Sequence, residues 1–195
     1  MKEQQIHIEN STAAEVERPV DVEPKVWYAM RVSYQQELKV KNNLDSRGIE
    51  SFIPMKYTLV VRRSRRVKML VPIVHDLIFM HVEPSLMKDL KAHSGLPIFY
   101  IMNPASKKPV TVPEDQMKNF IAVAGTYDDQ LEYLEDDIEK FNRGDRVRIM
   151  GGLFEGAEGV LLKTRSKHRV VVSIEGILAV VTAEVHPSLL QKLAK

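Results

Sequence analysis

Residues 144–160, GDRVRIMGGLFEGAEGV, indicate the fold class of the C-terminal part of this 195-residue chain. Val147 and Ile149 alternate with arginines, which is the two-residue period of a half-buried strand. The glycines that follow mark a tight loop with Phe154 at its tip, because glycine reaches backbone angles that cost other residues energy. Gly159 then opens another β-branched run. The stretch therefore predicts a strand, a glycine-rich loop and a second strand.

Short β-branched runs continue downstream at 160–162, 170–174 and 177–182, with glycines marking the turns. About 45 residues of this kind predict a small β-barrel, which closes its own sheet edges. The C-terminal tail, residues 187–195, has the composition of a short helix.

The upstream half alternates predicted strands with predicted helices. A compact run at 25–32 predicts a strand, and a helix is expected over about 34–47, with Gly48 as its stop. A short helix is predicted from Pro84, and a longer one between Pro113 and Gly125. The longer helix is the clearest in the sequence. Its apolar stripe consists of Met117, Phe120, Ile121 and Ala124. This alternation predicts a sheet with helices packed on it.

Amino-acid composition differs along the chain and divides it into five segments. We expect a flexible tail at 1–24, an α/β domain at 25–125, an acidic linker at 126–142, a β-domain at 143–186 and a C-terminal tail at 187–195. Within the linker, Leu131, Leu134 and Ile138 are spaced for a turn or two of helix.

Charge and cysteine content limit the classes of function. The formal net charge is only +2, so a nucleic-acid contact has to come from a local basic cluster. The chain has no cysteine, which excludes disulfides and zinc–thiolate sites. No apolar run approaches the roughly 18–20 residues that span a bilayer, and the polar start does not read as a signal peptide. We expect a cytoplasmic protein without a membrane partner.

The sequence gives little sign of catalytic chemistry. The six histidines are scattered without metal-ligand spacing. No phosphate-binding P-loop, nucleophile elbow or paired-carboxylate motif is present. We therefore expect a protein that is not an enzyme and that carries neither a metal nor another cofactor.

Both halves resemble one known family. Residues 144–160 resemble a KOW motif, with Leu153 where many relatives have proline. Upstream, Trp27 and Tyr28 at the start of the sheet, Ile53-Pro54 after the first helix, a basic turn and the Pro113 helix resemble the N-terminal domain of NusG transcription factors. The resemblance covers residues 26 to about 185. It implies an α+β fold: a NusG N-terminal (NGN) α/β sandwich followed by a small SH3-like β-barrel, the KOW domain.

One segment is similar to a specialised branch of this family. Residues 48–55, GIESFIPM, are similar to RfaH-like proteins, closest to the UpxY group that acts on capsule polysaccharide operons. Residues 75–77, HDL, replace a Pro-Gly-Tyr-like segment of housekeeping members. The implied function is transcription antitermination and elongation on selected long operons. Two alternatives stay open: a general housekeeping elongation factor, and a ribosome-associated RNA-binding protein. Fold switching of the KOW domain, as in RfaH, is a further alternative, although the valines and isoleucines of 170–181 favour a stable barrel.

The resemblance implies that the N-terminal domain docks on the clamp helices of the largest catalytic subunit of RNA polymerase. The matching polymerase-binding positions are Val74, Leu77, Phe79, Phe99 and Met102. Docking of a helix in a groove needs apolar anchors on a sheet face that the domain's own helices leave uncovered. The alternative is a strand that is covered on both faces.

A basic cluster lies between two segments that are predicted to form strands, 49–61 and 67–82. It consists of Arg62, Arg63, Arg65, Arg66 and Lys68. At a hairpin tip these charges would bind phosphates of the non-template strand or of the upstream duplex. No aromatic residue is interleaved, so we expect contacts to the backbone rather than base reading. The alternative is a solvated turn that is basic for solubility.

The predicted loop of the KOW motif is the third candidate site. The resemblance implies that Gly151, Gly152, Phe154 and Gly156 bind a ribosomal small-subunit protein or termination factor Rho. The alternative is a structural turn in which Phe154 caps the barrel. Arg165, Lys167, His168 and Arg169 form a second basic turn, which we interpret as a solvated hairpin. We expect the protein to be a monomer.

Overall fold

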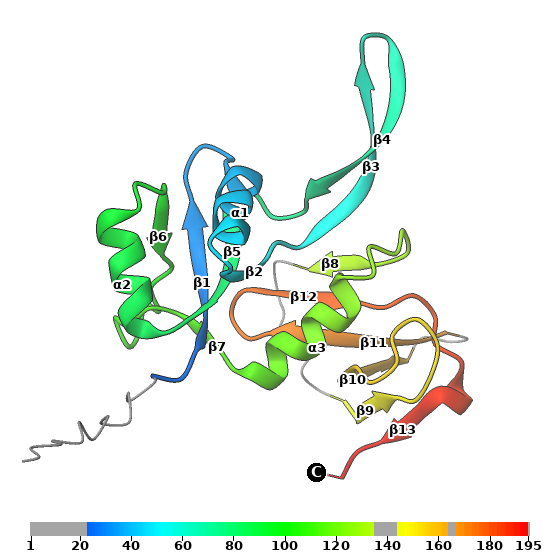
Figure 1. The fold of residues 1–195 in the computed structure, drawn as a ribbon. Helices are drawn as coiled ribbons and strands as arrows, with labels where there is room; N and C mark the ends of the chain where they lie inside the picture. Colours follow the sequence, from blue (N-terminus) through cyan, green and yellow to red (C-terminus); the bar gives the residue numbers. More distant parts are fainter. Residues whose placement is uncertain (1–22, 135–143, 164–166, 195) are drawn as a thin grey trace, which may run out of the picture.

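The computed structural model describes residues 23–134, 144–163 and 167–194 (Figure 1). Most of the predicted N-terminal tail, linker residues 135–142 and Arg165 lie outside this described part. The elements form a first sheet with helices, a protruding hairpin and a second sheet (Figure 1). The fold is thus a mixed α and β structure whose C-terminal part is rich in strands, as the sequence predicts.

The first sheet has the order β2-β5-β1-β6, and β7 also pairs with β1. Its strands are β1 (Val26–Val32), β2 (Glu50–Phe52), β5 (Leu77–Val82), β6 (Ile98–Tyr100) and β7 (Thr111–Val112). All of their pairings are antiparallel. Side chains alternate between the two faces of a strand, so β1 and β5 each supply apolar residues to both faces. This explains why β5 reads as a nearly continuous hydrophobic run, LIFMHV.

Helices cover both faces of this sheet. On one face, Met30 and Met80 pack with Val40 of α1 (Glu37–Ser46) and Leu90 of α2 (Pro84–His93). On the other face, Ala29 and Phe79 pack with Met117 and Phe120 of α3 (Glu114–Ala124). Met117, Phe120 and Ala124 of the predicted stripe are buried, whereas Ile121 is only partly buried and Val123, outside the stripe, is buried.

Helix α1 begins later than its sequence suggests. Tyr34 and Gln35 have positive φ angles of 61° and 51°, which exclude them from a right-handed helix. The loop is fixed by Asp76, whose carboxylate accepts a hydrogen bond from the Gln35 N–H at 3.1 Å. The buried carboxylate of Glu37 in turn accepts from the Asp76 N–H. A tertiary contact, rather than a local capping pair, thus sets the start of the helix.

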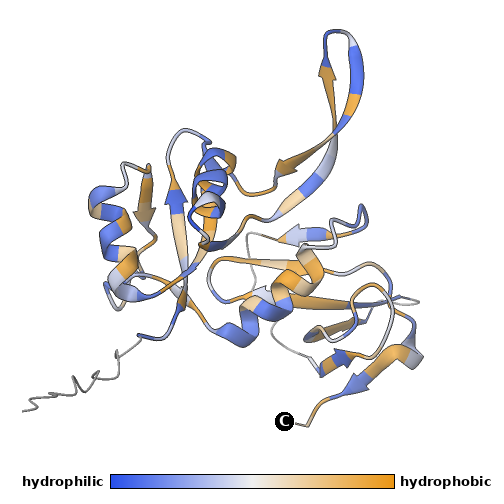
Figure 2. Ribbon diagram, in the orientation of Figure 1, coloured by the Kyte–Doolittle hydropathy of each residue, from blue (hydrophilic) through white to orange (hydrophobic). Residues whose placement is uncertain are grey.

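Strands β3 (Met55–Arg62) and β4 (Arg65–Pro72) pair only with each other and form a hairpin, which we call the arm. Its turn consists of Arg63 and Ser64, both at positive φ, as in the turns that match the twist of a hairpin. The arm projects away from the rest of the molecule (Figure 1). Apolar and polar residues alternate along it (Figure 2).

The second sheet has the order β13-β9-β10-β11-β12-β8. We call the part of the protein after residue 143, which contains every strand of this sheet except β8, the C-terminal domain. Its strands are β8 (Glu132–Leu134), β9 (Arg146–Ile149), β10 (Glu158–Lys163), β11 (His168–Ile174), β12 (Leu178–Val181) and β13 (Leu190–Lys192). The strand–loop–strand prediction for 144–160 is confirmed, since Val147 and Ile149 are buried while Arg146 and Arg148 are exposed.

Two predictions of helix are wrong. Linker residues Glu132–Leu134 form β8, which pairs with β12 instead of forming a helical turn. In the C-terminal tail, a short 3-10 turn, η1 (Pro187–Leu189), is followed by β13, which pairs with β9. In both places an open strand edge supplies backbone partners that a short helix would have to find within itself.

Helix α3 also contacts the C-terminal domain. The Glu158 N–H of β10 donates to Asn119 Oδ1 at 2.9 Å, and the Glu175 N–H donates to Gln116 Oε1 at 3.5 Å. The buried residues around α3 form one continuous cluster that includes Phe79 from the first sheet and Val172 from the second. Figure 1 shows α3 lying between the two sheets.

Gly159 is the position in the C-terminal domain where a side chain is least tolerable. A Cβ there would lie 2.3 Å from the Val171 carbonyl oxygen and 2.7 Å from Val170 Cγ1. We expect Gly159→Ala to lower the free energy of unfolding by about 1–3 kcal/mol, as overpacking does, in urea unfolding followed by circular dichroism. Gly151→Ala is the matched control, because its nearest neighbour is a flexible leucine methyl group at 3.4 Å. Equal losses in the two variants would contradict this account.

Candidate functional site

Strand β5 is covered on both faces, contrary to the open face expected for docking. Leu77 and Phe79 are 4% and 0% exposed and lie in the cluster that contains α3. The rings of Phe79 and Phe120 have centroids 6.3 Å apart. Ile78 and Met80 are equally buried on the opposite face. The expectation that Leu77 and Phe79 are directly accessible is therefore wrong for this structure.

The other predicted docking residues are more accessible. Phe99 is 50% exposed on β6 and Met102, just after this strand, is 47% exposed. Arg31 of β1 pairs with Phe99 on one side and with Leu77 on the other, which places these three side chains in a row across the sheet. Val74 is half-buried against the same core. We call Phe99 and Met102 the β6 surface.

The side chain of His81 contacts both the sheet and α3. Its ring stacks on Trp27 with centroids 4.7 Å apart and planes 3° apart. Its Nδ1 lies 2.8 Å from Glu50 Oε2, and its Nε2 lies 3.4 Å from Glu114 Oε2 in the first turn of α3. The histidine therefore joins β2, β5 and α3. Within the described ranges, no cluster of histidines and carboxylates has the arrangement of a metal site.

The arm carries the predicted basic cluster at and near its tip. Arg62, Arg63, Arg65 and Arg66 are all exposed, and none of them forms an ion pair with a described residue. Lys68 differs, because its Nζ lies 2.8 Å from Asp129 Oδ2 and 4.8 Å from the centre of the Tyr57 ring. The structure thus separates four arginines that are open to a ligand from a lysine that already has partners.

Sequence reasoning missed an apolar stripe on the arm. Tyr57, Leu59 and Val61 alternate along β3 and are 43%, 65% and 68% exposed. They pair across the hairpin with Leu70, Lys68 and Arg66. The alternation in MKYTLVVR is the signal that could have identified this stripe. One face of the arm therefore combines exposed apolar residues on β3 with basic residues on β4.

The loop between β9 and β10 presents different residues from those expected. Phe154 is only 6% exposed and lies in the core cluster. Gly152 and Gly156 adopt positive φ angles of 85° and 84°, and the Gly156 N–H donates to the Ile149 carbonyl at 2.8 Å. The expectation of an accessible Phe154 is wrong here, since the loop folds its ring inward. Met150 and Leu153, at 51% and 60% exposure, are the accessible apolar residues.

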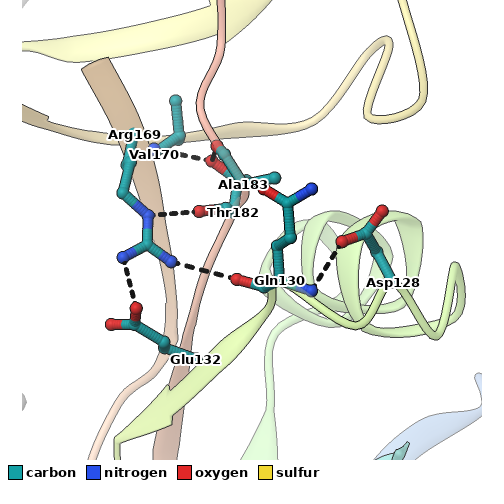
Figure 3. A network of polar contacts seen from close by, with 7 residues as sticks. All are labelled: Asp128, Gln130, Glu132, Arg169, Val170, Thr182 and Ala183. Atoms are coloured by element: carbon teal, nitrogen blue, oxygen red, sulfur yellow. Dashed lines mark hydrogen bonds and ion pairs between the residues drawn. The ribbon is translucent and has the colours of Figure 1, made fainter. Parts of the chain in front are cut away.

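The second basic turn is not simply solvated. Arg169 has a side chain that is only 16% exposed, and its guanidinium bonds to three partners (Figure 3). Nη1 donates to Glu132 Oε1 at 2.7 Å, Nη2 donates to the Gln130 carbonyl at 3.2 Å, and Nε donates to the Thr182 carbonyl. For Arg169 the interpretation as a solvated hairpin is therefore wrong.

None of the helices in the described part of the chain has the length and apolar character needed to cross a membrane.

Comparison with known proteins identifies the N-terminal part. The family described as "NusG: Transcription termination factor nusG" matches residues 25–121, which run from β1 into α3 and include the arm. This part of the chain is thus similar to the domain of that family. No curated protein matches the chain. A solved structure titled "Domain interaction in Thermotoga maritima NusG" matches with 19% sequence identity and a TM-score of 0.41, over 87% of this chain and 98% of that chain.

Proposed function

We propose that this protein is a NusG-type transcription factor that binds RNA polymerase through residues 25–121 and keeps it elongating. The observation that carries the proposal is the family match across that whole domain. The function is one of binding, without a chemical step. The second sheet, with its strand–glycine-loop–strand segment at 144–160, supplies the KOW-like half that the proposal requires.

The β6 surface is the proposed contact with the polymerase clamp helices. Phe99 and Met102 are the exposed apolar anchors, and Val74 adds a half-buried one. Leu77 and Phe79 are buried under α3 in the core of the same sheet, so we assign them to the support of this surface and not to the contact itself. Phe99 is an exposed aromatic residue with Lys91 Nζ 5.7 Å from its ring centre, and aromatic residues are enriched at protein interfaces.

The arm is the proposed nucleic-acid contact. Four exposed arginines without acidic partners among the described residues give it a local positive field, although the chain as a whole is nearly neutral. Such a field attracts phosphates irrespective of sequence. With the β6 surface on polymerase, the arm would contact the backbone of the non-template strand or of the upstream duplex.

Simultaneous contact with the clamp and with nucleic acid would promote elongation by changing the populations of the open and closed states of the polymerase clamp. A factor that binds the closed clamp more tightly than the open, paused clamp favours the closed state. The C-terminal domain would recruit a ribosomal small-subunit protein or Rho through Met150 and Leu153, at a local concentration raised by its covalent connection. Residues 48–55 favour the specialised role, antitermination on selected long operons such as those for capsular polysaccharide.

Substitutions of two phenylalanines should have different effects, one on stability and the other on polymerase binding. Phe79→Ala should lower the free energy of unfolding by about 3–5 kcal/mol, because it removes a fully buried ring. Phe99→Ala, at a half-exposed ring, should cost less than about 1 kcal/mol but weaken binding to a clamp-helix fragment at least about tenfold in calorimetry. Leu38→Ala, at an exposed leucine of α1, is the control and should bind as the wild type does. Unchanged affinity of Phe99→Ala would remove the β6 surface from the proposal.

The arm should contribute salt-dependent affinity for DNA. Replacing Arg62, Arg63, Arg65 and Arg66 with alanine should reduce the slope of log K against log salt by up to about 3–4, because about 0.7–0.9 counterion is released per phosphate contact. The measurement is a fluorescence-anisotropy titration of the full chain with duplex and single-stranded DNA. A variant with Lys39, Lys88, Lys118 and Lys163 changed to alanine matches the change in charge at other exposed positions. The same loss of slope in both variants would show a general charge effect and contradict an arm site.

Genome-wide occupancy distinguishes the specialised role from its alternatives. We expect crosslinked, tagged protein to follow RNA polymerase along one or a few long operons. Occupancy that tracks polymerase on all genes would instead make the protein a general elongation factor. Ribosome association without any polymerase-linked signal would overturn the proposed function.

A further inference from the structure

The apolar stripe of the arm lies on one of its two faces. Tyr57, Leu59 and Val61 of β3 point to the same side, because alternate residues of a strand share a face. Residues that pair directly across an antiparallel hairpin also share a face. The β4 partners of the stripe on this side are Leu70, Lys68 and Arg66. We call this side of the arm the stripe face.

The stripe face is open to solvent over most of its length. Leu59 and Val61 are 65% and 68% exposed, and Tyr57, nearer the root of the arm, is 43% exposed. Both strands of the arm pair only with each other. Contiguous exposed apolar residues mark contact sites more often than scattered ones do. The monomer that we expect from the sequence would leave this apolar surface in water.

The charges on the stripe face are divided between its two ends. Near the tip, Arg66 is exposed and forms no ion pair with a described residue. Near the root, Asp129 Oδ2 lies 2.8 Å from Lys68 Nζ, which itself lies 4.8 Å from the centre of the Tyr57 ring. The Tyr127 ring meets the Tyr57 ring edge-on, with centroids 6.4 Å apart. The stripe face therefore has an acidic group at its root, apolar residues along its middle and a basic tip.

Such a face is complementary to a second copy of itself. When two arms lie face to face and antiparallel, the basic end of each meets the acidic end of the other. A parallel arrangement would bring the two arginine-rich tips together, and like charges at close range repel. Self-complementarity is the condition for a dimer with two-fold symmetry. The formal net charge of only +2 adds little repulsion between the two copies.

We propose that two copies of this protein associate through the stripe faces of their arms. In this antiparallel dimer the Leu59 side chains of the two copies meet at the two-fold axis, and Val61 of each copy packs on Tyr57 of the other. The contact removes the exposed part of the stripe from water, which is its main driving force. This association concerns the free protein and goes beyond the proposed contacts with polymerase and nucleic acid.

The charged residues set the alignment of the two arms. Arg66 of each copy reaches Asp129 of the other. A carboxylate has two oxygens and accepts from more than one donor, so Asp129 can bind this arginine while it keeps Lys68. Lys68 pairs with Leu59 and so lies near the axis, where Asp129 already offsets its charge. Arg62 and Arg65 lie on the opposite face of the arm, so the dimer leaves them open.

The contact between the two arms is small. Interfaces that bury less than about 1,200 Å² are typically weak and transient. A stripe of three apolar residues in each copy belongs to this class. We therefore expect a dissociation constant in the micromolar range, so that the fraction of dimer changes over the concentrations that sedimentation velocity can examine.

Sedimentation velocity of the full chain, without polymerase or DNA, is the first measurement. The wild type should change from monomer to dimer as its concentration rises. Leu59→Glu should weaken dimerisation at least about tenfold, because two carboxylates would meet at the axis among apolar groups. Since Leu59 is 65% exposed, this variant should keep an unfolding midpoint close to that of the wild type.

Val67→Glu is the matched control. It replaces an aliphatic residue by glutamate on the same arm, at a position that is 42% exposed. Val67 pairs with Val60 and lies on the face opposite the stripe. This variant changes the charge of the arm as much as Leu59→Glu does, and it should dimerise as the wild type does.

Exchange of the two charges tests the antiparallel alignment. Arg66→Glu would place two carboxylates together at each end of the contact, and Asp129→Lys would place two cations together there. Each variant alone should stay monomeric at concentrations where the wild type dimerises. Mixed in equal amounts, the two variants should form a heterodimer. In that heterodimer the new glutamate meets the new lysine, and the native Arg66 meets the native Asp129.

The outcomes are distinct. Dimerisation that is lost in Leu59→Glu, kept in Val67→Glu and restored in the mixture of charge variants supports the proposal. A wild type that stays monomeric would assign the stripe to a different protein and overturn the dimer. Equal losses in Leu59→Glu and Val67→Glu, or a mixture that does not associate, would also overturn it. None of these outcomes bears on polymerase binding, so the proposed function is tested separately.

Discussion

The two-sided burial of α3 is the interaction on which the rest of the structure depends. One side of this helix places Met117 and Phe120 on the first sheet, where the ring of Phe120 meets Phe79. The other side offers the amide oxygens of Gln116 and Asn119 to the C-terminal domain. Buried apolar residues around α3 also form one continuous cluster that reaches Val172 of the second sheet, so the helix removes apolar surface from water on both sides.

This arrangement explains where accessible surface remains for partners. Since α3 covers Leu77 and Phe79, the apolar contact left on the first sheet lies at its edge strand, at Phe99 and beside Arg31. The arm has no helix over it, so its arginines and its stripe of Tyr57, Leu59 and Val61 stay exposed. The β6 surface and the arm are therefore two separate accessible surfaces, as the proposed contacts with a protein and with a polyanion require.

Sequence patterns predicted the elements better than their partners. The alternation of Val147 and Ile149 identified β9 correctly, because half-burial produces a period of two wherever the strand packs. The inward position of Phe154 and the pairing of β8 were not evident, since a tertiary partner decides both. Exposed candidates such as the arginines of the arm were easier to place, because a local turn at Arg63 and Ser64 determines their position.

The sequence by itself determined the class of the two halves, the helix stripe of α3 and the basic tip of the arm. Each of these depends on residues that are close together in the chain. Only the tertiary structure decided that β5 is covered on both faces, that Arg169 binds Glu132 and that Glu132–Leu134 joins the second sheet. Those outcomes depend on which surfaces meet across long sequence separations, where burial and backbone hydrogen bonding outweigh local propensity.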